Sequence, residues 1–423
     1  MPADYPARTL VLTLCCILFG ACLASAAGFQ QHRVWFPVGP NPSAIAAADL
    51  TGNGIPEIVT TDSGMLTDPR SERPANNELS VLAANEPLRY EKQVPLITGF
   101  GPYCIAIANM DALPALDLIV GSFHTVERRG ESGDLVLFRN IGDLLFEPVD
   151  FSVPVERLRY LRTRDADNQP IFTKPGITSL VVNDFDGDGY RDVIATGWSS
   201  DVLIYFPGHP TTYLGEPRFI RASGGPRHIQ AADFDGNGIL DLVTVMYATG
   251  EIVLWKGDGQ GDFEEVDRFL SRGALPHKVR VADVNGSGKL DLIVSDCHTY
   301  DSVTIYYGTG GFRFDVSQEI RLGESRSVLE HEIRDILVED LNGNGRPDMA
   351  LACFASNRVY VLTNTSEKGA MPQSFSRSVF TFESGGKIGK PRALCTGDFN
   401  GNGVKDIAVA LWNANAVALL LGR

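Results

Sequence analysis

The sequence predicts an all-β fold, a seven-bladed β-propeller, and three observations support this prediction. First, a nine-residue acidic loop of the form D-x-[DN]-G-[DN]-G-x-x-[DE] recurs, with variations, seven times along the 423-residue chain. Second, short apolar, β-branched runs flank each loop, and helical periodicity is nearly absent. Third, the chain contains 43 glycines, which recur at a regular spacing between these runs. Four short strands per repeat with turns between them are typical of propeller blades.

The seven loops divide the chain into repeats that account for nearly all of it. They start 49 to 75 residues apart, at Asp49–Glu57, Asn109–Asp117, Asp184–Asp192, Asp233–Asp241, Asp283–Asp291, Asp340–Asp348 and Asp398–Asp406. An apolar strand such as Val279–Ala282 precedes each loop, and a second strand such as Leu292–Ser295 follows it. A third strand and, after a glycine-rich turn, a fourth strand complete each repeat.

The two ends of the chain are expected to close the ring. The seventh repeat stops after its third strand, Ala416–Leu421, and Phe29–Val38 has the pattern of a fourth strand without a blade of its own. Pairing these two segments would leave no open edge strand. We therefore expect residues 28–423 to form a single propeller domain.

Residues 1–27 are expected to be a secretory signal peptide. Arg8 precedes the apolar run Thr9–Leu18, which is too short to cross a bilayer, and small residues lead up to a cleavage site near Ala27. The alternative is a lipoprotein signal with a lipid anchor at Cys22, although Phe19 stands where such signals usually carry Leu. No other segment approaches the length of a membrane span. The sequence thus predicts a secreted protein, extracellular or periplasmic, with a lipid tether as the alternative.

Oxygen-bearing side chains fall at positions 1, 3, 5 and 9 of the loops, which indicates calcium sites. Calcium takes about six to eight oxygen ligands, and the glycines permit the positive φ that a tight turn needs. The strands on both sides of each loop and the lack of a bidentate Glu at position 12 argue against an EF-hand. The predicted ligands, several structural Ca²⁺ ions in all, are Asp49, Thr51, Asn53, Glu57, Asp184, Asp186, Asp188, Asp192, Asp233, Asp235, Asn237, Asp241, Asp283, Asn285, Ser287, Asp291, Asp340, Asn342, Asn344, Asp348, Asp398, Asn400, Asn402 and Asp406.

The second repeat departs from this pattern. Ala112 and Pro114 replace the two glycines, and Leu113 stands where an oxygen is needed. We expect this loop to hold no metal. For the other loops, the alternative is Asx-type turns that close without an ion.

The net charge follows from the same loops. The chain has 37 Lys and Arg against 52 Asp and Glu, a formal net charge of −15. The seven loops hold 17 of these acids, and without them the net charge would be +2. The low isoelectric point therefore indicates metal coordination, and nucleic acid is excluded as a first choice of partner.

These loops resemble those of the FG-GAP/VCBS-type repeat proteins, whose propellers are similar to that of the integrin α chain. The resemblance covers essentially all of the chain after residue 27. It implies a seven-bladed propeller with calcium in the inter-strand loops, extracellular and devoted to adhesion or glycan binding. The Phe-Gly and Gly-Ala-Pro signatures of true integrin repeats are missing.

Two positions of the repeat, one before and one after the loop and called registers here, are expected to meet on the face opposite the metal loops. The residues six before each loop are Ser43, Tyr103, Thr178, Arg227, His277, Arg334 and Arg392, and the neighbours His228 and Lys278 are also basic. The residues six after each loop are Ser63, Phe123, Trp198, Tyr247, Cys297, Phe354 and Trp412. A basic funnel ringed by aromatic side chains suits an anionic sugar, because guanidinium groups pair with carboxylates and flat rings stack on sugar faces. Alternatively, the aromatics only wedge neighbouring blades apart, and the arginines pair with acids such as Asp335.

Long insertions are expected on the same face. They are Ser63–Glu78, His124–Gly133 and Glu156–Pro170, the last with four arginines. Extra loop length on a rigid scaffold is where binding usually occurs. A solvated loop without function is the alternative.

Two functions follow from these observations. The first is a non-enzymatic, calcium-binding adhesion module whose ligand on this face is an acidic polysaccharide or an extracellular protein. The second is a polysaccharide lyase acting on uronic-acid polymers, with His277 or Tyr103 as the base and Arg227, Arg334 and Arg392 neutralising the carboxylate. No GxSxG, HExxH or phosphate-binding motif is present.

Overall fold

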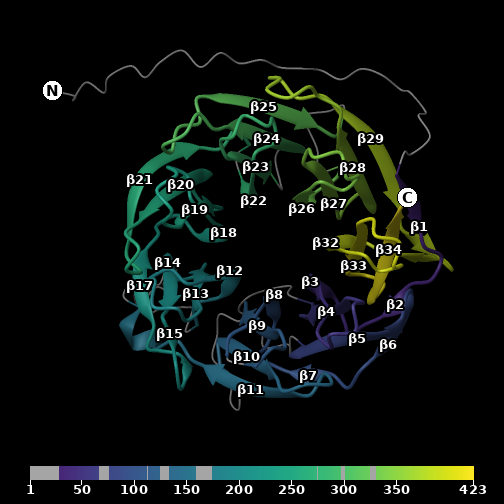
Figure 1. Ribbon diagram of the computed structural model, residues 1–423, viewed down its shortest axis with the longest axis horizontal. Helices are drawn as coiled ribbons and strands as arrows, with labels where there is room; N and C mark the ends of the chain where they lie inside the picture. The colour runs from purple at the N-terminus through teal and green to yellow at the C-terminus, as the bar shows by residue number, and fades with distance from the viewer. Residues whose placement is uncertain are drawn as a thin grey trace, which may run out of the picture.

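The computed structural model is a closed ring of seven antiparallel sheets around a central axis (Figure 1). It describes residues 28–65, 76–111, 113–123, 133–158, 174–273, 275–296, 301–323 and 330–423. Within these residues the only helix is one 3₁₀ turn, η1 (Val155–Arg157), and no helix is long and apolar enough to span a membrane. The predicted leader, with Ala27 and Cys22, lies outside the described residues.

Each blade is a four-stranded meander, with its first strand nearest the axis (Figure 1). Blade one contains β3 (Pro42–Ala48), β4 (Glu57–Asp62), β5 (Glu78–Glu86) and β6 (Arg89–Lys92), with β7 (Leu96–Ile97) beside β5. Blade two contains β8 (Pro102–Ala108), β9 (Asp117–Ser122), β10 (Leu135–Asn140) and β11 (Phe146–Phe151). Blade three contains β12 (Ile177–Asn183), β13 (Asp192–Gly197), β14 (Val202–Phe206) and β17 (Arg218–Arg221), with the hairpin β15 (Gly208–His209) and β16 (Tyr213–Leu214).

Blade four contains β18 (Pro226–Ala232), β19 (Asp241–Met246), β20 (Glu251–Gly257) and β21 (Phe263–Leu270). Blade five contains β22 (Pro276–Ala282), β23 (Asp291–Asp296), β24 (Ser302–Tyr307) and β25 (Val316–Arg321). Blade six contains β26 (Ile333–Glu339), β27 (Asp348–Cys353), β28 (Arg358–Asn364) and β29 (Phe375–Thr381), followed by the hairpin β30 (Glu383–Ser384) and β31 (Lys387–Ile388). Blade seven contains β32 (Pro391–Gly397), β33 (Asp406–Leu411) and β34 (Ala416–Gly422).

The first described strand closes the ring, as the sequence predicts. Strand β1 (Phe29–Gln31) pairs antiparallel with β34, placing Phe29 opposite Gly422, and β2 (Phe36–Pro37) pairs with the other end of β34. Phe29 is buried among the apolar side chains of blades six and seven. The first and last blade are therefore joined by main-chain hydrogen bonds and by packing.

The core lies between the blades. All six residues of the second strand are buried in every blade, because this strand packs against neighbouring blades on both faces of its sheet. Strands that are buried on both faces read as continuous apolar runs, which is the pattern seen in the sequence. Exposed polar residues lie at the two ends of the ring and on the outer strands, such as β21 and β29.

Candidate functional site

Every inner strand carries a register shift near its start. In blade one the shift lies between Pro42 and Ala44, so that Ser43 has no partner in the neighbouring strand. The shifts in the other six blades lie between Pro102 and Cys104, Ile177 and Leu180, Pro226 and His228, Pro276 and Lys278, Ile333 and Asp335, and Pro391 and Ala393. A β-bulge bends the strand and re-aims a side chain. The residues six before each loop are thus the bulge residues, repeated seven times around one end of the axis.

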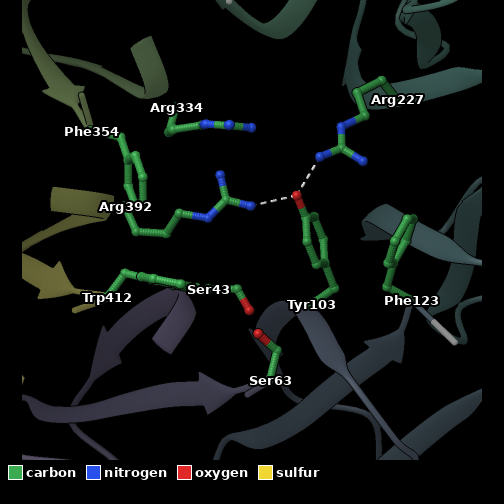
Figure 2. A pocket seen from close by; sticks show the side chains of 9 residues that line it. All are labelled: Ser43, Ser63, Tyr103, Phe123, Arg227, Arg334, Phe354, Arg392 and Trp412. Carbon is green, nitrogen blue, oxygen red and sulfur yellow. Dashed lines mark hydrogen bonds between the residues drawn. The ribbon is translucent and has the colours of Figure 1, made fainter. Parts of the chain in front are cut away.

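Five of these seven bulge residues help to line a cavity of about 220 Å³ at the mouth of the central channel (Figure 2). Its walls come from the two sequence registers that were predicted to meet. They are Ser43, Ser63, Tyr103, Phe123, Arg227, Arg334, Phe354, Arg392 and Trp412. The mouth, as we name this cavity, therefore combines three guanidinium groups with four aromatic rings.

Tyr103 is held between two arginines across the mouth (Figure 2). Its phenol oxygen accepts a hydrogen bond from Arg392 Nη2 at 2.6 Å and another from Arg227 Nη2. The two guanidinium carbons also lie 5.0 and 5.4 Å from the centre of the Tyr103 ring, within the range of cation–π attraction. Blades two, four and seven are thus linked through one oxygen atom.

The surroundings of Tyr103 favour its anionic form. Burial by itself would raise the pKa of the phenol, but the positive charges of Arg227, Arg392, Arg334 and Lys278 outweigh burial and lower the pKa to about 7. A tyrosine in water has a pKa near 10. Tyr103 therefore exchanges its proton close to neutral pH.

The arginines differ in their acidic partners. Arg334 pairs with Glu332 on its own blade and lies over the Phe354 ring. Among the residues that the structure describes, Arg227 and Arg392 form no ion pair with a carboxylate; their polar partners at the mouth are Tyr103 and, for Arg227, His277 Nε2 at 3.2 Å. Two positive charges thus face the mouth without a carboxylate to neutralise them.

The aromatic rings form two groups on either side of the mouth. Phe123 packs between Tyr103 and Trp198, with ring centres 5.1 and 5.7 Å away. Phe354 and Trp412 meet edge to face at 5.5 Å. Trp198 thus supports a lining residue from behind, and Tyr247 is not among the lining residues. Cys297, in the same register, falls outside the described residues.

A second cavity, of about 170 Å³, lies in the channel and shares Ser43, Tyr103, Arg334 and Arg392 with the mouth. The predicted ligand residues His228, His277 and Lys278 line this inner cavity and not the mouth. His277 is 2% exposed, and its Nε2 faces Arg227. Burial and the charge of Arg227 hold the pKa of His277 well below its ordinary value, and burial likewise lowers the pKa of Lys278.

Asp335 provides the negative charge of this inner cavity. Its Oδ1 lies 3.2 Å from Arg280 Nη2 and 3.8 Å from Lys278 Nζ, and its Oδ2 accepts the backbone N–H of Leu394. Arg280 is not among the ligand residues predicted from the sequence. The signal was present in the repeat register, since Arg280 stands three residues before its loop and Asp335 five before its own.

The predicted metal loops join the first and second strands at the far end of the blades. Their first-position carboxylates cap their own turns: in blade three, Asp184 accepts the N–H groups of Gly187 and Gly189, whose φ angles are 77° and 89°. Backbone of this kind favours glycine. The turn geometry is therefore maintained by the protein itself.

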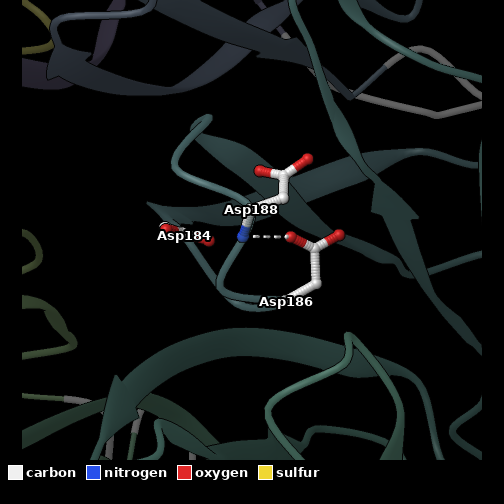
Figure 3. A group of neighbouring side chains, drawn as sticks. All are labelled: Asp184, Asp186 and Asp188. Atoms are coloured by element: carbon white, nitrogen blue, oxygen red, sulfur yellow. Dashed lines mark hydrogen bonds between the residues drawn. The ribbon is translucent and has the colours of Figure 1, made fainter.

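The loop of blade three brings three acidic side chains together (Figure 3). Carboxylate oxygens of Asp184, Asp186 and Asp188 all lie within 4.8 Å of one another, as do those of Asp233, Asp235 and Asp241 in blade four. An all-oxygen set of like charges fits a hard divalent cation. In blade four, however, Lys256 Nζ already lies 2.5 Å from Asp235.

The ninth-position acids have a role within the fold. Each is buried at the start of a second strand, and burial raises the pKa of all seven. In blade seven, Asp406 accepts the N–H of Phe399 at 2.9 Å and that of Gly422 at 2.7 Å, which ties the loop to the third strand. Equivalent bonds to the loop's second residue recur in every blade.

The blade-two loop holds a side-chain cation. Arg139 on β10 reaches Asp111, the third-position acid, at 2.9 Å. No oxygen cluster of three acids forms there among the described residues. The third-position acid of this loop is thus paired with an arginine of its own blade.

Large parts of the three predicted insertions lie outside the residues that the structure describes. Residues 66–75, 124–132 and 159–173 are not described, and they include three of the four arginines of the third insertion. Arg157, the fourth, stacks over Phe219 and lies 3.6 Å from Glu216.

The fold and the loops both have known counterparts. A model of the FG-GAP-like repeat family matches residues 184–244 and 340–409, which contain the loops of blades three, four, six and seven. A search of curated proteins found no match.

Solved structures share the ring over almost the whole chain. The crystal structure of BBS1N in complex with ARL6DN matches with a TM-score of 0.57 and 14% identity, covering 92% of this chain and 96% of that one. Virginiamycin B lyase from Staphylococcus aureus matches with a TM-score of 0.57 and 11% identity, covering 93% and 99%. A catalytically inactive form of that enzyme with quinupristin matches at 0.54 and 11%, covering 93% and 98%. Identities this low show the fold alone. The chain thus contains FG-GAP-like repeats in four of the blades of a seven-bladed β-propeller.

Proposed function

We propose that this protein is an exported binding module that captures the carboxylate groups of an acidic polysaccharide at the channel mouth. A propeller with FG-GAP-like repeats is typical of binding and adhesion proteins. The observation that carries the finer proposal is the pair Arg227 and Arg392, two guanidinium groups that face one cavity with no carboxylate partner among the described residues. Export is inferred from the sequence of residues 1–27 alone.

The chemistry of the mouth favours a sugar acid over a simple anion. Guanidinium groups bind carboxylates through paired hydrogen bonds, and the rings of Phe123, Phe354 and Trp412 offer flat apolar surfaces beside them. The cavity is smaller than the roughly 300 Å³ of sites that enclose a drug-sized ligand. It therefore suits one residue of a polymer whose chain continues over the face of the ring.

Calcium in this proposal stabilises the scaffold and does not contact the ligand. The oxygen cluster of Asp184, Asp186 and Asp188 supports a site in blade three, and the remaining predicted loops follow by repetition. The loops lie at the opposite end of seven-residue strands from the bulges, about 20 Å away at the usual rise per residue. A bound ion would offset the repulsion among the clustered carboxylates.

The test is a calorimetric titration of the purified protein, in calcium, with oligogalacturonate and with a neutral oligosaccharide of the same length. We expect binding of the acidic sugar only. The double variant Arg227→Gln, Arg392→Gln should bind about 10- to 100-fold more weakly, as expected for the loss of charge-assisted hydrogen bonds. Arg89→Gln is the matched control, because Arg89 is an exposed arginine on the outer strand β6 that pairs with Glu86.

Equal binding by the double variant and the control would contradict the mouth as the site. If no acidic sugar binds the wild type, the remaining candidate from the sequence is an extracellular protein. In that case the arginines would be expected to meet acidic side chains of the partner.

A second candidate function is β-elimination on a uronic-acid polymer, and Tyr103 is the observation that favours it. A phenolate held by two arginines could remove the proton next to the sugar carboxylate while the arginines neutralise that carboxylate. The glycosidic C–O bond would break as a C=C bond forms, and the leaving oxygen would take up a proton. His277 is the poorer base because it is buried beneath Arg227.

The two functions give different products. A lyase would release an unsaturated, ultraviolet-absorbing sugar from oligogalacturonate, and Tyr103→Phe would abolish this product. A binding module would leave the oligosaccharide intact, as judged by its mass after prolonged incubation.

A further inference from the structure

The anion site at the mouth already contains an ionisable hydrogen-bond acceptor of the protein itself. The phenol oxygen of Tyr103 accepts N–H groups from both Arg227 and Arg392, the positions that a ligand carboxylate would take (Figure 2). Tyr103 lies on β8, whereas the two arginines come from β18 and β32. The contact therefore depends on the closed ring and not on local sequence.

The charged and titratable groups around Tyr103 come from four other inner strands. They are Arg227 and His228 on β18, His277, Lys278 and Arg280 on β22, Arg334 and Asp335 on β26 with Glu332 just before that strand, and Arg392 on β32. The bulge residues of the two remaining inner strands, Ser43 on β3 and Thr178 on β12, do not titrate in the ordinary range.

The two carboxylates among these groups, those of Glu332 and Asp335, pair with basic residues other than Arg227 and Arg392. Glu332 pairs with Arg334, and Asp335 lies with Lys278 and Arg280 in the inner cavity. Among the described residues, the phenol oxygen is thus the acidic group that contacts both Arg227 and Arg392.

We propose that Tyr103 is the internal counter-ion of the mouth, and that an anionic ligand replaces it on Arg227 and Arg392 while the phenolate takes up one proton from solvent. This inference rests on the proposed function of the mouth as a carboxylate site. It adds that binding is coupled to a single protonation step at a known atom.

The coupling has a simple electrostatic cause. A phenolate and a ligand carboxylate on the same two guanidinium groups would repel each other in a buried, weakly screened site. Protonation of Tyr103 removes that repulsion and turns its oxygen into a donor that can hydrogen-bond the incoming carboxylate. Since the pKa of Tyr103 is about 7 without ligand, the proton must be supplied whenever binding occurs above neutral pH.

The direction of the pH dependence follows from linkage. Below about pH 7 the phenol is already protonated, and affinity should be constant. Above it, affinity should fall by up to tenfold per pH unit, approaching about 100-fold between pH 7 and pH 9. The buried histidines stay neutral over this range, because burial and neighbouring positive charges hold their pKa well below its ordinary value. Burial also lowers the pKa of Lys278, and Tyr103→Phe retains this lysine, so its protonation affects both proteins alike.

The experiment is calorimetric titration of the purified protein with oligogalacturonate at about pH 6, 7, 8 and 9. Each titration is done in two buffers of different ionisation enthalpy and equal ionic strength. We expect close to one proton taken up per ligand bound at the upper pH values and none at pH 6. Tyrosinate difference absorbance should fall in parallel as ligand is added at pH 8.

The Tyr103→Phe variant removes the ionisable oxygen and keeps the ring. It should bind oligogalacturonate with an affinity that changes less than about threefold across the same pH range, with no linked proton. Tyr213→Phe is the matched control, because Tyr213 lies under Arg139 and does not line the mouth. This control should keep the wild-type pH dependence, and thermal melts of both variants establish that they are folded.

Failure of this inference can be separated from failure of the proposed function. If the wild type binds the oligosaccharide without proton uptake, or if Tyr103→Phe keeps the same pH dependence, the counter-ion role is wrong and the carboxylate site remains. If the oligosaccharide binds at none of these pH values, the proposed function itself is overturned, and the coupling with it.

Discussion

Arg139 occupies the acidic loop of blade two, with its Nε and Nη2 atoms 3.0 and 2.9 Å from the same oxygen of Asp111. Asp111 is the third-position acid of that loop, equivalent to Asp186 in the oxygen cluster of blade three. The repeat thus neutralises this acid with a guanidinium group in the blade whose loop has lost its glycines. Loops of one sequence pattern therefore differ in what balances their charge.

The first prediction concerns this arginine. Arg139→Met should lower the free energy of unfolding by about 1–3 kcal/mol, because Asp111 is largely buried and would lose its charged partner. The loss should be equal in calcium and in chelator, as measured by urea denaturation in both. A loss that appears only in chelator would indicate that calcium can replace Arg139 and that the blade-two loop binds metal after all.

The second prediction concerns the blade-three loop. Asp188→Asn keeps an oxygen that can accept the N–H of Tyr190, now 2.8 Å from Asp188 Oδ1, but removes one of three clustered charges. Calcium affinity of this site should fall roughly tenfold, since affinity depends on ligand charge. The readout is the melting temperature during a calcium titration. Identical melting of the wild type with calcium and with chelator would contradict the calcium proposal as a whole.

The third prediction tests whether the ninth-position acids stabilise the fold independently of a bound metal. Asp406→Ala leaves the buried N–H groups of Phe399 and Gly422 without their acceptor. We expect a loss of about 2–6 kcal/mol, from roughly 1–3 kcal/mol for each of the two unsatisfied groups. Because this bond network is part of the fold, the loss should persist in chelator. A variant as stable as wild type in chelator would mean that Asp406 serves the metal alone.

The fourth prediction tests closure of the ring. Phe29→Ala removes a ring that is 8% exposed and packed in the core of blades six and seven. Stability should fall by about 3 kcal/mol, the lower end for deletion of a buried phenylalanine. Val34→Ala is the control, since Val34 is 52% exposed in the same segment and should change stability by less than about 0.5 kcal/mol.

The fifth prediction concerns stability and pH without any ligand. The pKa of Tyr103 is about 7 in the folded protein and near 10 in an unfolded chain. Between these values the unfolded state binds the extra proton, so the stability of the wild type relative to Tyr103→Phe should rise with pH, by at most about 1.4 kcal/mol per unit. Below pH 7 the difference should be constant. Urea unfolding of both proteins from pH 6 to pH 9 measures this, and a flat difference throughout would mean that the arginines do not favour the phenolate.

The sequence by itself determined the architecture. Seven loops at the same phase define seven blades, and the unpaired segments Phe29–Val38 and Ala416–Leu421 predict the closing pair that β1 and β34 form. The same spacing predicted which two registers of the repeat meet at the mouth, since all nine residues that line the mouth belong to them. Repetition makes this possible, because each repeat independently shows the same spacing between its loop and its strands.

The tertiary structure alone decided how those residues face the axis. In a regular strand, His277 and Lys278 would point to opposite faces, but the bulge between Pro276 and Lys278 lets both line the channel. A bulge depends on pairing with the next strand and leaves no hydrophobic pattern in the sequence. Five of the seven shifts do follow a proline at the first strand position, which is a usable signal.

The contacts between distant blades also required the fold. Tyr103 and Arg392 are 289 residues apart in sequence, yet they share a hydrogen bond across the mouth. Arg139 and Asp111 meet because a third strand passes beside the loop of its own blade. Residue types and spacing indicate which groups are available, but pairing depends on distances that are fixed only when the ring closes.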